Sequence, residues 1–333
     1  MSNWLEVRIP ISPRADYFNR VRLIAHSIRS LGGRYADVRI RVTVGADREP
    51  EDLRALLPWS DAAGVTWHWV ERSEFRAWAG TSHAYIATMM ERFRPPFDAD
   101  NILMLDADVV AVRPFDELMS RLERRPAVAG MMAHVSPFGD APAPNRVAWQ
   151  ERQGAGTDAP ASNHIAWWRH LFQIAGMDPP AFDQQLSGWG VMTNDPGQKM
   201  SPAYFNTGVI LAPSRLLERL HEPYTDALSL VRSALDNYFF EQIALTLALY
   251  RAGIPFDVLP LRYNFPNQAG FDASSPEDLS DLCFLHFLRD DVVSRERDFE
   301  SLDAMAALAA RTDLVGSNEA FRRRVAQLLP LLT

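Results

Sequence analysis

Apolar residues in the first third of the chain follow two alternating periodicities. Short β-branched runs are typical of strands and occur at residues 7–11, 38–47 and 65–71. Apolar residues at helical spacing follow the first run and recur at residues 84–93. The apolar run NILMLDADVV then begins at Asn101. Because strands and helices alternate, we expect a mostly parallel, doubly wound central sheet flanked by helices, an α/β fold.

The pattern changes after about residue 130. Residues 130–202 are rich in Pro, Gly, Asn and Trp, with one clear helical stretch at 164–176. Periodicity returns at YFNTGVILAPS, residues 204–214, which predicts a strand. Residues 229–253 predict a helix or a helix pair that ends at a glycine.

Two more strands and a helical tail follow. FDVLPLRYNF, residues 256–265, and LCFLHFL, residues 282–288, predict strands, and two amphipathic helices form the tail. We therefore predict one domain over residues 1–295, with 130–202 as a large insertion, and a C-terminal helical extension over 296–333.

Composition and charge narrow the possible partners. The 333 residues carry a formal charge of −8, which argues against a nucleic-acid partner. A single cysteine, Cys283, excludes an intrachain disulfide and suits a reducing compartment. Glu6 and Asp16 lie where a signal peptide would be uncharged, and no apolar run is long enough for a membrane span. We expect a cytoplasmic protein without a transmembrane segment.

Two carboxylates follow the apolar run ILML at the carboxyl end of a predicted strand. Asp106 and Asp108 are i and i+2, so in an extended segment both side chains point to one side and approach one hard cation. Mg²⁺ or Mn²⁺ held by carboxylates and substrate phosphate is a common arrangement, and α/β sheets bind ligands at this edge. The residues alone leave the alternative that one aspartate caps a turn and the other is solvated.

Four segments together resemble one enzyme family. They are LMLDADVVAVRPFDEL, YFNTGVILAPSRLL, FFEQIAL, and LPLRYNF followed by FLHF. In order and rough spacing, across most of residues 5–290, they resemble the nucleotide-sugar glycosyltransferases of the GT-A fold. The resemblance is closest to the retaining glycosyltransferase family 8, which includes glycogenin and bacterial galactosyltransferases.

The resemblance implies a metal-dependent hexosyltransferase. It would move a sugar from a nucleotide-sugar donor, a UDP-sugar by default, to a carbohydrate or small-molecule acceptor with retention of configuration. Asp106, Asp108 and His286 would be the metal ligands, with Mn²⁺ or Mg²⁺ as the ion. From its apolar surroundings alone, His286 is more often a satisfied core residue, and it is the resemblance that favours a metal ligand.

The resemblance also assigns the donor and the reacting carbon. Asp106 would contact the donor, and Glu241, Gln242 and Asn206 would lie near the reacting carbon. Tyr17 would stack on the base, although it could instead pack against the first helix, and Glu241 and Gln242 could be an ordinary polar helix face. The remaining donor-binding residues on this resemblance are Arg92, Asn206, Thr207 and Gly208.

The sequence departs from the family after the histidine. The family has a Gly and a Lys there that hold the diphosphate, whereas this chain reads HFLRDD, and Arg289 is the cation we expect to take their place. The acidic neighbour of the glutamine is Glu241 rather than Asp. These departures raise a second hypothesis, a catalytically altered GT-A module that only binds nucleotides.

The tryptophans of the insertion are candidates for acceptor binding. Trp189, flanked by glycines, is the best of them, and Trp149 is another. Trp167 and Trp168, in the predicted helix, are better explained as the core of a small subdomain.

Two further alternatives concern the aspartate pair and the tail. Haloacid-dehalogenase-type phosphatases also end an apolar strand with Asp-x-Asp, with Asp106 as nucleophile and Asp108 as general acid, but on their first strand. The basic, amphipathic segment 321–332 fits peripheral contact with an anionic membrane, or a helix packed on its own domain.

Overall fold

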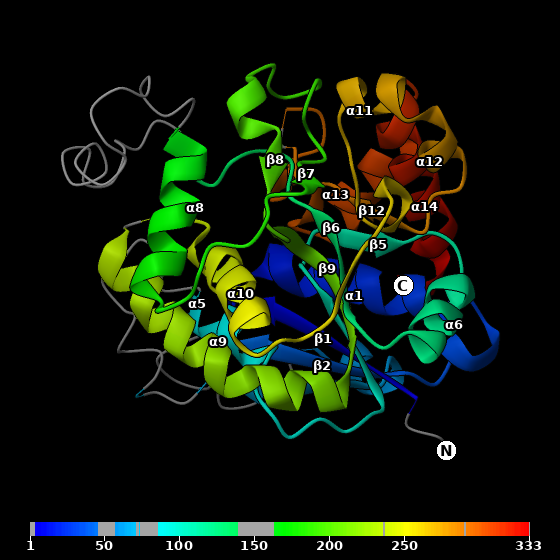
Figure 1. Ribbon diagram of the computed structural model, residues 1–333. Helices are drawn as coiled ribbons and strands as arrows, with labels where there is room; N and C mark the ends of the chain where they lie inside the picture. The colour runs from blue at the N-terminus through cyan, green and yellow to red at the C-terminus, as the bar shows by residue number, and fades with distance from the viewer. Residues whose placement is uncertain are drawn as a thin grey trace. The chain divides into compact units, whose positions relative to one another are not determined.

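The computed structural model describes residues 4–45, 57–70, 73, 86–138, 163–235, 237–289 and 291–332 (Figure 1). The chain forms two compact units. The first comprises residues 1–131, 207–218 and 259–333, and the second comprises 132–206 and 219–258. Among the described residues, no helix combines the length and the apolar character needed to cross a membrane.

The central sheet confirms the predicted α/β class. Strand β1 (Leu5–Ile11) pairs in parallel with β2 (Arg39–Val44) and β4 (Asn101–Leu105), and β2 pairs in parallel with β3 (Val65–Trp69). Strand β9 (Phe205–Pro213) is antiparallel to β4. Six of the seven strands lie wholly or mostly in the first unit, in the order β6-β9-β4-β1-β2-β3, where β6 is Val128–Met132.

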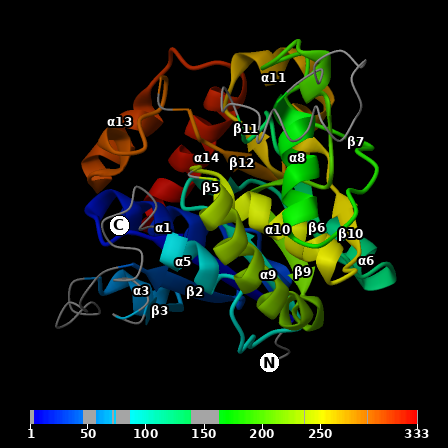
Figure 2. The same ribbon diagram turned by 60° about the vertical axis from the view of Figure 1, so that its left-hand side comes forward.

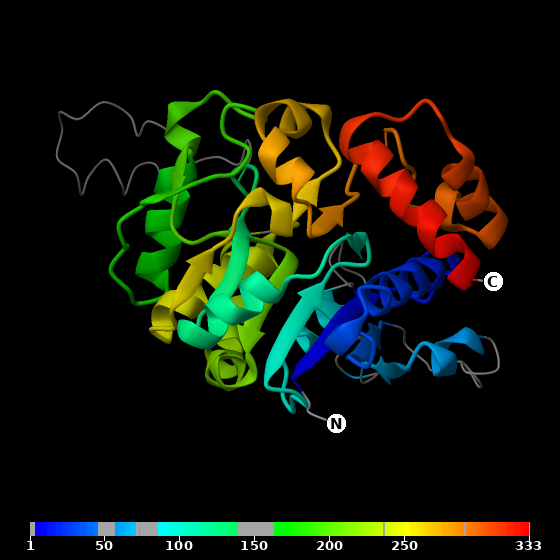
Figure 3. The same ribbon diagram turned by 90° about the vertical axis from the view of Figure 1, so that its right-hand side faces the viewer.

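The amphipathic patterns at both ends of the chain become helices that pack within the first unit. Helix α1 (Ala15–Arg29) buries Val21 and Ile24, as its apolar spacing predicts. The C-terminal helix α14 (Gly316–Leu332) packs against α1 (Figure 3). Its Arg324 donates to the carbonyl oxygens of Ala111 and Ser27 at 2.8 and 2.7 Å.

The apolar face of α14 is buried within the first unit. Phe321, Val325 and Leu328 are at most 1% exposed. Of the two alternatives for this segment, the structure therefore shows the helix packed on its own domain. The apolar face that a membrane contact would require is buried.

A second, small sheet replaces the continuous closing strands that we expected. It consists of β5 (Val109–Ala111), β12 (Phe284–His286) and β11 (Phe265–Pro266), with β12 antiparallel to β5 and parallel to β11. The predicted strand over 256–265 is wrong as one element, because Pro260 interrupts it between β10 (Phe256–Val258) and the 3₁₀ turn η3 (Leu261–Tyr263).

The second unit is mainly helical. Its helices are α8 (Asn163–Ile174), α10 (Phe240–Arg251) and most of α9 (Ser214–Ala234). Helices α9 and α10 run side by side (Figure 2). The predicted helix pair is therefore present, although its first member begins earlier than expected. The unit's other short elements are β7 (Gln184–Gln185), η2 (Pro196–Gln198), β8 (Met200–Ser201) and β10.

Short helices complete the first unit. They are η1 (Gly33–Tyr35), α3 (Trp59–Ala62), α5 (Ile86–Glu91), α6 (Asp116–Arg124), η3 (Leu261–Tyr263), α11 (Ala269–Ser274), α12 (Pro276–Ser280), η4 (Arg297–Phe299) and α13 (Leu302–Ala310).

Candidate metal and donor site

The aspartate pair forms the connection between the two sheets. The main-chain N–H of Asp106 donates to the carbonyl oxygen of Gly208 at 2.9 Å, and that of Val109 donates to Asp106 at 3.2 Å. The segment is thus a tight turn between β4 and β5, not the extended stretch that we expected. The turn carries the chain from the buried sheet into the small sheet, where Asp108 meets a strand from much later in the sequence.

That later strand is β12, which brings His286 to the turn. His286 lies opposite Val109 in the β12–β5 pair, and the N–H of Phe287 donates to the carbonyl oxygen of Asp108 at 2.8 Å. One ligand atom from each of Asp106, Asp108 and His286 then lies within 4.8 Å of the others. The structure therefore brings together the three residues predicted to hold a metal.

Both carboxylate oxygens of Asp108 are engaged by cationic or protonatable groups. Nε2 of His286 lies 3.1 Å from Oδ1, and Nη1 of Arg295 donates to Oδ2 at 2.8 Å. Burial alone would raise the pKa of Asp108, but His286 and Arg295 together lower that pKa well below its usual range. Burial also opposes the charged form of His286, yet Asp108 raises the pKa of His286 above its ordinary value.

The ring of His286 is oriented from its other side. Oδ1 of Asn264, a side chain with no exposed surface, accepts a hydrogen bond from Nδ1 at 3.0 Å, so Nε2 faces the aspartates. Metal-binding histidines usually have such a partner. Two carboxylates and an imidazole so oriented suit Mn²⁺ or Mg²⁺, with remaining positions left to phosphate oxygens and water. The residues present therefore fit a divalent cation.

Arg92 contacts the site at Asp106. Its side chain has no exposed surface, and Nη1 donates to Oδ1 of Asp106 at 2.9 Å and to the carbonyl oxygen of Thr207 at 3.1 Å. The structure thus places Arg92, Asp106 and Thr207 in direct contact, with Gly208 bonded to the Asp106 main chain. These are four of the residues that the resemblance assigned to the donor.

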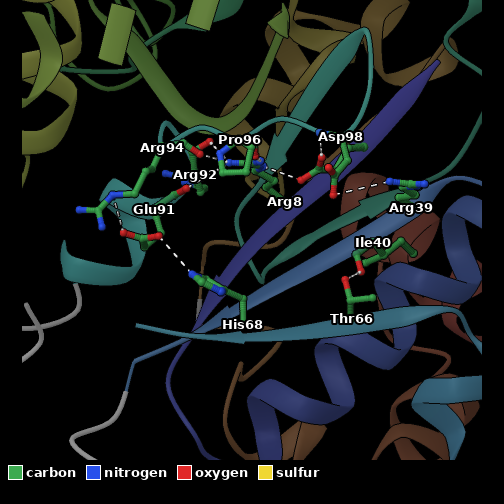
Figure 4. Close-up of polar contacts among 11 residues, drawn as sticks. Arg8, Arg39, Ile40, Thr66, His68, Glu91, Arg92, Arg94, Pro96 and Asp98 are labelled. Atoms are coloured by element: carbon green, nitrogen blue, oxygen red, sulfur yellow. Dashed lines mark hydrogen bonds and ion pairs between the residues drawn. The ribbon is translucent and has the colours of Figure 1, made fainter. Parts of the chain in front are cut away.

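A buried arginine in β1 supports the segment that carries Arg92 (Figure 4). Nη1 of Arg8 donates to the carbonyl oxygen of Arg94 at 2.6 Å, and Nη2 donates to that of Pro96 at 2.6 Å. Glu6 accepts from Nε of Arg8 at 2.6 Å and from the N–H of Asp98 at 2.9 Å. The sequence analysis did not identify Arg8, because a single arginine in a short apolar strand belongs to no motif.

Two predicted donor residues lie in the first unit with other contacts. Tyr17 lies in the first turn of α1, and the guanidinium of Arg20 lies 3.9 Å from its ring centroid. Arg289 donates through Nε to Gln268 at 3.2 Å, and its main-chain N–H donates to Asn267 at 2.9 Å. The cation on Asp108 is Arg295 instead. Sequence spacing gave no sign of it, because it lies nine positions after His286 in a charged stretch.

The residues predicted to act on the sugar belong to the second unit. Asn206 precedes Thr207 in β9 and is partly buried. Glu241, in the first turn of α10, is 4% exposed. Burial, together with the nearby Glu241 carboxylate, raises the pKa of Tyr204 well above its usual value. Gln242 follows it in the same turn and is partly buried.

The tryptophans of the second unit separate into two groups. Trp168 has no exposed surface and Trp167 has 6%, so these two form subdomain core, as the sequence favoured. Nε1 of Trp189 donates to the carbonyl oxygen of Asp195 at 3.3 Å, and the Lys199 ammonium lies 4.6 Å from its ring centroid. Trp149 lies outside the described residues.

Solved structures of other proteins share this architecture, although comparisons of sequence find no match. No family model and no curated protein matches the chain by sequence. Among solved structures, the galactosyltransferase LgtC, in complex with donor and acceptor sugar analogs, aligns over 98% of this chain and 96% of its own, with a TM-score of 0.53 and 15% identity.

A second solved structure, the bifunctional glycosyltransferase WbbM, aligns over 100% of this chain and 51% of its own, with a TM-score of 0.55 and 14% identity. This chain therefore spans about half the length of that protein. Likeness at such identities reports the fold. The chain has the GT-A fold and resembles glycosyltransferases of family 8.

Proposed function

We propose that the chain is a metal-dependent glycosyltransferase that takes its sugar from a nucleotide-sugar donor. One observation carries the proposal: Asp106, Asp108 and His286 converge within 4.8 Å on a GT-A fold. The Asp-x-Asp phosphatase hypothesis fails on the fold, since β4 follows three other strands in the chain and pairs with the antiparallel β9.

The residues of the first unit would bind the donor's charged part. Asp106, Asp108 and His286 hold the ion, which when bound neutralises charge on the leaving diphosphate. Asn264 orients His286, and Arg92 orients Asp106. The donor is a UDP-sugar, with Tyr17 against the base and Arg289 near the diphosphate, as the resemblance implies.

The residues of the second unit would handle the sugar and the acceptor. Asn206, Glu241 and Gln242 act near the reacting carbon, and transfer retains configuration, giving a hexosyltransferase. Trp189 contributes to the acceptor site. In this proposal residues 1–295 form the catalytic domain, with insertion 130–202 on the acceptor side, and 296–333 form its helical extension.

A thermal-shift screen of nucleotide sugars, with and without MnCl₂, tests the proposal. A ligand that binds only the folded state raises the melting temperature, so a matching donor should do so only with Mn²⁺. The stabilisation should disappear in Asp108→Ala and persist in Asp291→Ala, which removes an exposed carboxylate from the segment after His286.

Each alternative outcome has a distinct meaning. No manganese-dependent binding of any nucleotide would overturn the proposal. Binding without transfer to any acceptor, and without hydrolysis of the donor, would indicate the altered nucleotide-binding module. Hydrolysis of p-nitrophenyl phosphate that depends on Asp106 would restore the phosphatase hypothesis.

A further inference from the structure

Helix α14 contacts both strands next to the candidate metal ligands. Phe321 stacks on Phe287, the residue after His286, with 4.4 Å between ring centroids and 25° between ring planes. Three positions later on the same helix, Arg324 donates through Nε to the carbonyl oxygen of Ala111 in β5 at 2.8 Å. Residues three apart lie on one side of a helix, so a single face of α14 contacts β5 and the end of β12.

The contact with Ala111 completes the outer edge of the small sheet. Among the described residues, β5 is the last strand in the order β11-β12-β5, so its outer edge has no neighbouring strand. Side chains take that place: the N–H of Ala111 donates to Oγ of Ser27 at 3.1 Å, and its carbonyl oxygen accepts from Arg324. Ala111 has no exposed surface, where unpaired main-chain groups are costly. The position of β5 therefore depends on α1 and α14 as well as on β12.

Stability alone is a poor explanation for a buried arginine at this position. Arg324 is 8% exposed, and its partners within the described residues are all uncharged oxygen atoms, so burial lowers the pKa of its guanidinium. Nη2 donates to Ser27 and Ser30 at the C-terminal end of α1, where a helix attracts a cation, but this offsets only part of the desolvation cost. An apolar side chain could fill the space without that cost, but it could not donate to Ala111.

The two contacted residues are close to the metal site. Ala111 is three positions after Asp108, and Phe287 directly follows His286. The N–H of Phe287 donates to the carbonyl oxygen of Asp108 at 2.8 Å, so the β12–β5 pairing extends up to the candidate ligands. A shift of either strand changes the 3.1 Å distance between Nε2 of His286 and Oδ1 of Asp108. Binding sites of this kind require their side chains to be held to within about 0.5 Å.

We propose that Arg324 and Phe321 are positioning residues for the metal site. Through Ala111 and Phe287 they hold β5 and β12 in the alignment that places Asp108 beside His286. This inference rests on the proposed function, and it makes the C-terminal helix a part of the site that binds the ion.

Hydrogen exchange of the full-length chain without metal, read by mass spectrometry, tests the alignment directly. Arg324→Met removes the donor to Ala111 and keeps the aliphatic stem. Peptides that contain Val112 and Phe287, whose N–H groups bond across the strand pair, should exchange on the order of tenfold faster, the effect of one lost hydrogen bond. Exchange in β1 should not change, because a local opening exposes only the strands that separate.

Mn²⁺ binding, read by electron paramagnetic resonance, tests the consequence for the site. Arg324→Met should bind Mn²⁺ on the order of tenfold more weakly, since the ligands are less well held. Phe321→Leu keeps the core apolar but loses the stacking on Phe287, so it should show the same two changes in weaker form.

Leu328→Ala is the matched control. Leu328 is 1% exposed and lies about one turn beyond Arg324, so this variant removes buried volume from the same helix and leaves both contacts in place. It should lower the melting temperature at least as much as Arg324→Met does. Its Mn²⁺ affinity, and its exchange at Val112 and Phe287 relative to β1, should match those of the unmodified chain.

The failures of the two proposals are distinguishable. If the unmodified chain binds no Mn²⁺, the proposed function fails, and the exchange comparison still tests the alignment of the two strands. If it binds Mn²⁺, and Arg324→Met matches Leu328→Ala in exchange pattern and affinity, the positioning role is overturned while the proposed function stands. Faster local exchange without a loss of Mn²⁺ affinity also overturns the positioning role, because the strands would then move without disturbing the ligands.

Discussion

Oδ1 of Asn264 accepts a hydrogen bond from Nδ1 of His286 at 3.0 Å, so the buried amide determines which ring nitrogen faces Asp108. Asn264→Ala removes that acceptor and lets the ring turn or change tautomer. We expect Mn²⁺ affinity, measured by electron paramagnetic resonance, to fall roughly 10- to 100-fold, as it does when the partner of a metal-binding histidine is lost.

Asn267→Ala provides the control for loss of a buried amide. Asn267 is 2% exposed, and its side chain hydrogen-bonds Asn318 and the main chain of Arg289 instead of the His286 ring. It should lower stability without the same loss of Mn²⁺ affinity. Equal affinities in Asn264→Ala and the unmodified chain would show that the ring is held by other contacts.

The buried Arg8–Glu6 pair should be a large contributor to stability. Both side chains are at most 2% exposed, and Arg8 also donates to carbonyl oxygens after α5. Arg8→Met leaves the Glu6 carboxylate buried without its cation, which we expect to lower the free energy of unfolding by roughly 3–5 kcal/mol. Urea denaturation followed by circular dichroism measures this change.

Two variants check the cause of that loss. Glu6→Gln in the Arg8→Met background removes the orphaned charge and should recover part of the stability. Arg39→Met breaks the pair with Asp98, which spans 3.5 Å between side chains that are more than half exposed, and should cost at most about 1 kcal/mol (Figure 4). Comparable losses in Arg8→Met and Arg39→Met would show that burial does not govern these pairs.

Local pattern predicted the parts of the fold that depend on neighbours in sequence. The strands β1, β2 and β3 and the helix α1 lie where periodicity placed them. The antiparallel direction of β9 was not predictable, because a buried strand has the same alternation in either direction. The break at Pro260 was not predicted either, because we placed this residue inside a strand over 256–265.

The same distinction holds in the candidate site. Asp106, Asp108 and His286 were found because they belong to motifs, and the structure brings them together. Arg295 was missed because its role depends on a long-range contact, which the spacing of charged residues does not encode. Arg289, the nearer cation in sequence, instead bonds Gln268 through its side chain.

His164 makes the stability of the second unit depend on pH. Burial lowers the pKa of His164 to about 4, while Ser136 and the carbonyl oxygen of Met200 hydrogen-bond its two nitrogens. Above pH 6.5 the ring is neutral in both states. As the pH falls below 6.5 the unfolded chain takes up a proton that the folded chain does not, so stability decreases until about pH 4.

The expected loss from this one group is roughly 2–3 kcal/mol between pH 7.5 and 4.5. His164→Gln should therefore be destabilised relative to the unmodified chain at pH 7.5, with the gap narrowing by that amount at pH 4.5. Urea denaturation followed by tryptophan fluorescence measures both, since Trp168 packs beside His164. His170→Gln, on the same helix, is the control, and a constant gap across pH would contradict the assignment.

Cys283 offers a chemical probe of the strand that carries His286. It is free, 6% exposed, and burial raises its pKa to about 11, so little thiolate is present at pH 8. Compared with a thiol of ordinary pKa, 9.0, the smaller thiolate fraction alone slows the reaction of Cys283 with a disulfide reagent by roughly 100-fold. Native labelling should therefore be far slower than labelling in urea.

Ligands at the site should slow the native reaction further. The carbonyl oxygen of Cys283 accepts from the N–H of Val112 at 2.8 Å, so the thiol becomes accessible when β12 separates from β5. That separation parts His286 from Asp108, and ligands that bind only the closed arrangement suppress it in proportion to their saturation. Mn²⁺ with UDP should thus slow labelling in the unmodified chain and leave Asp108→Ala unaffected. Unchanged rates under conditions where both ligands bind would mean that Cys283 is reached without opening this strand pair.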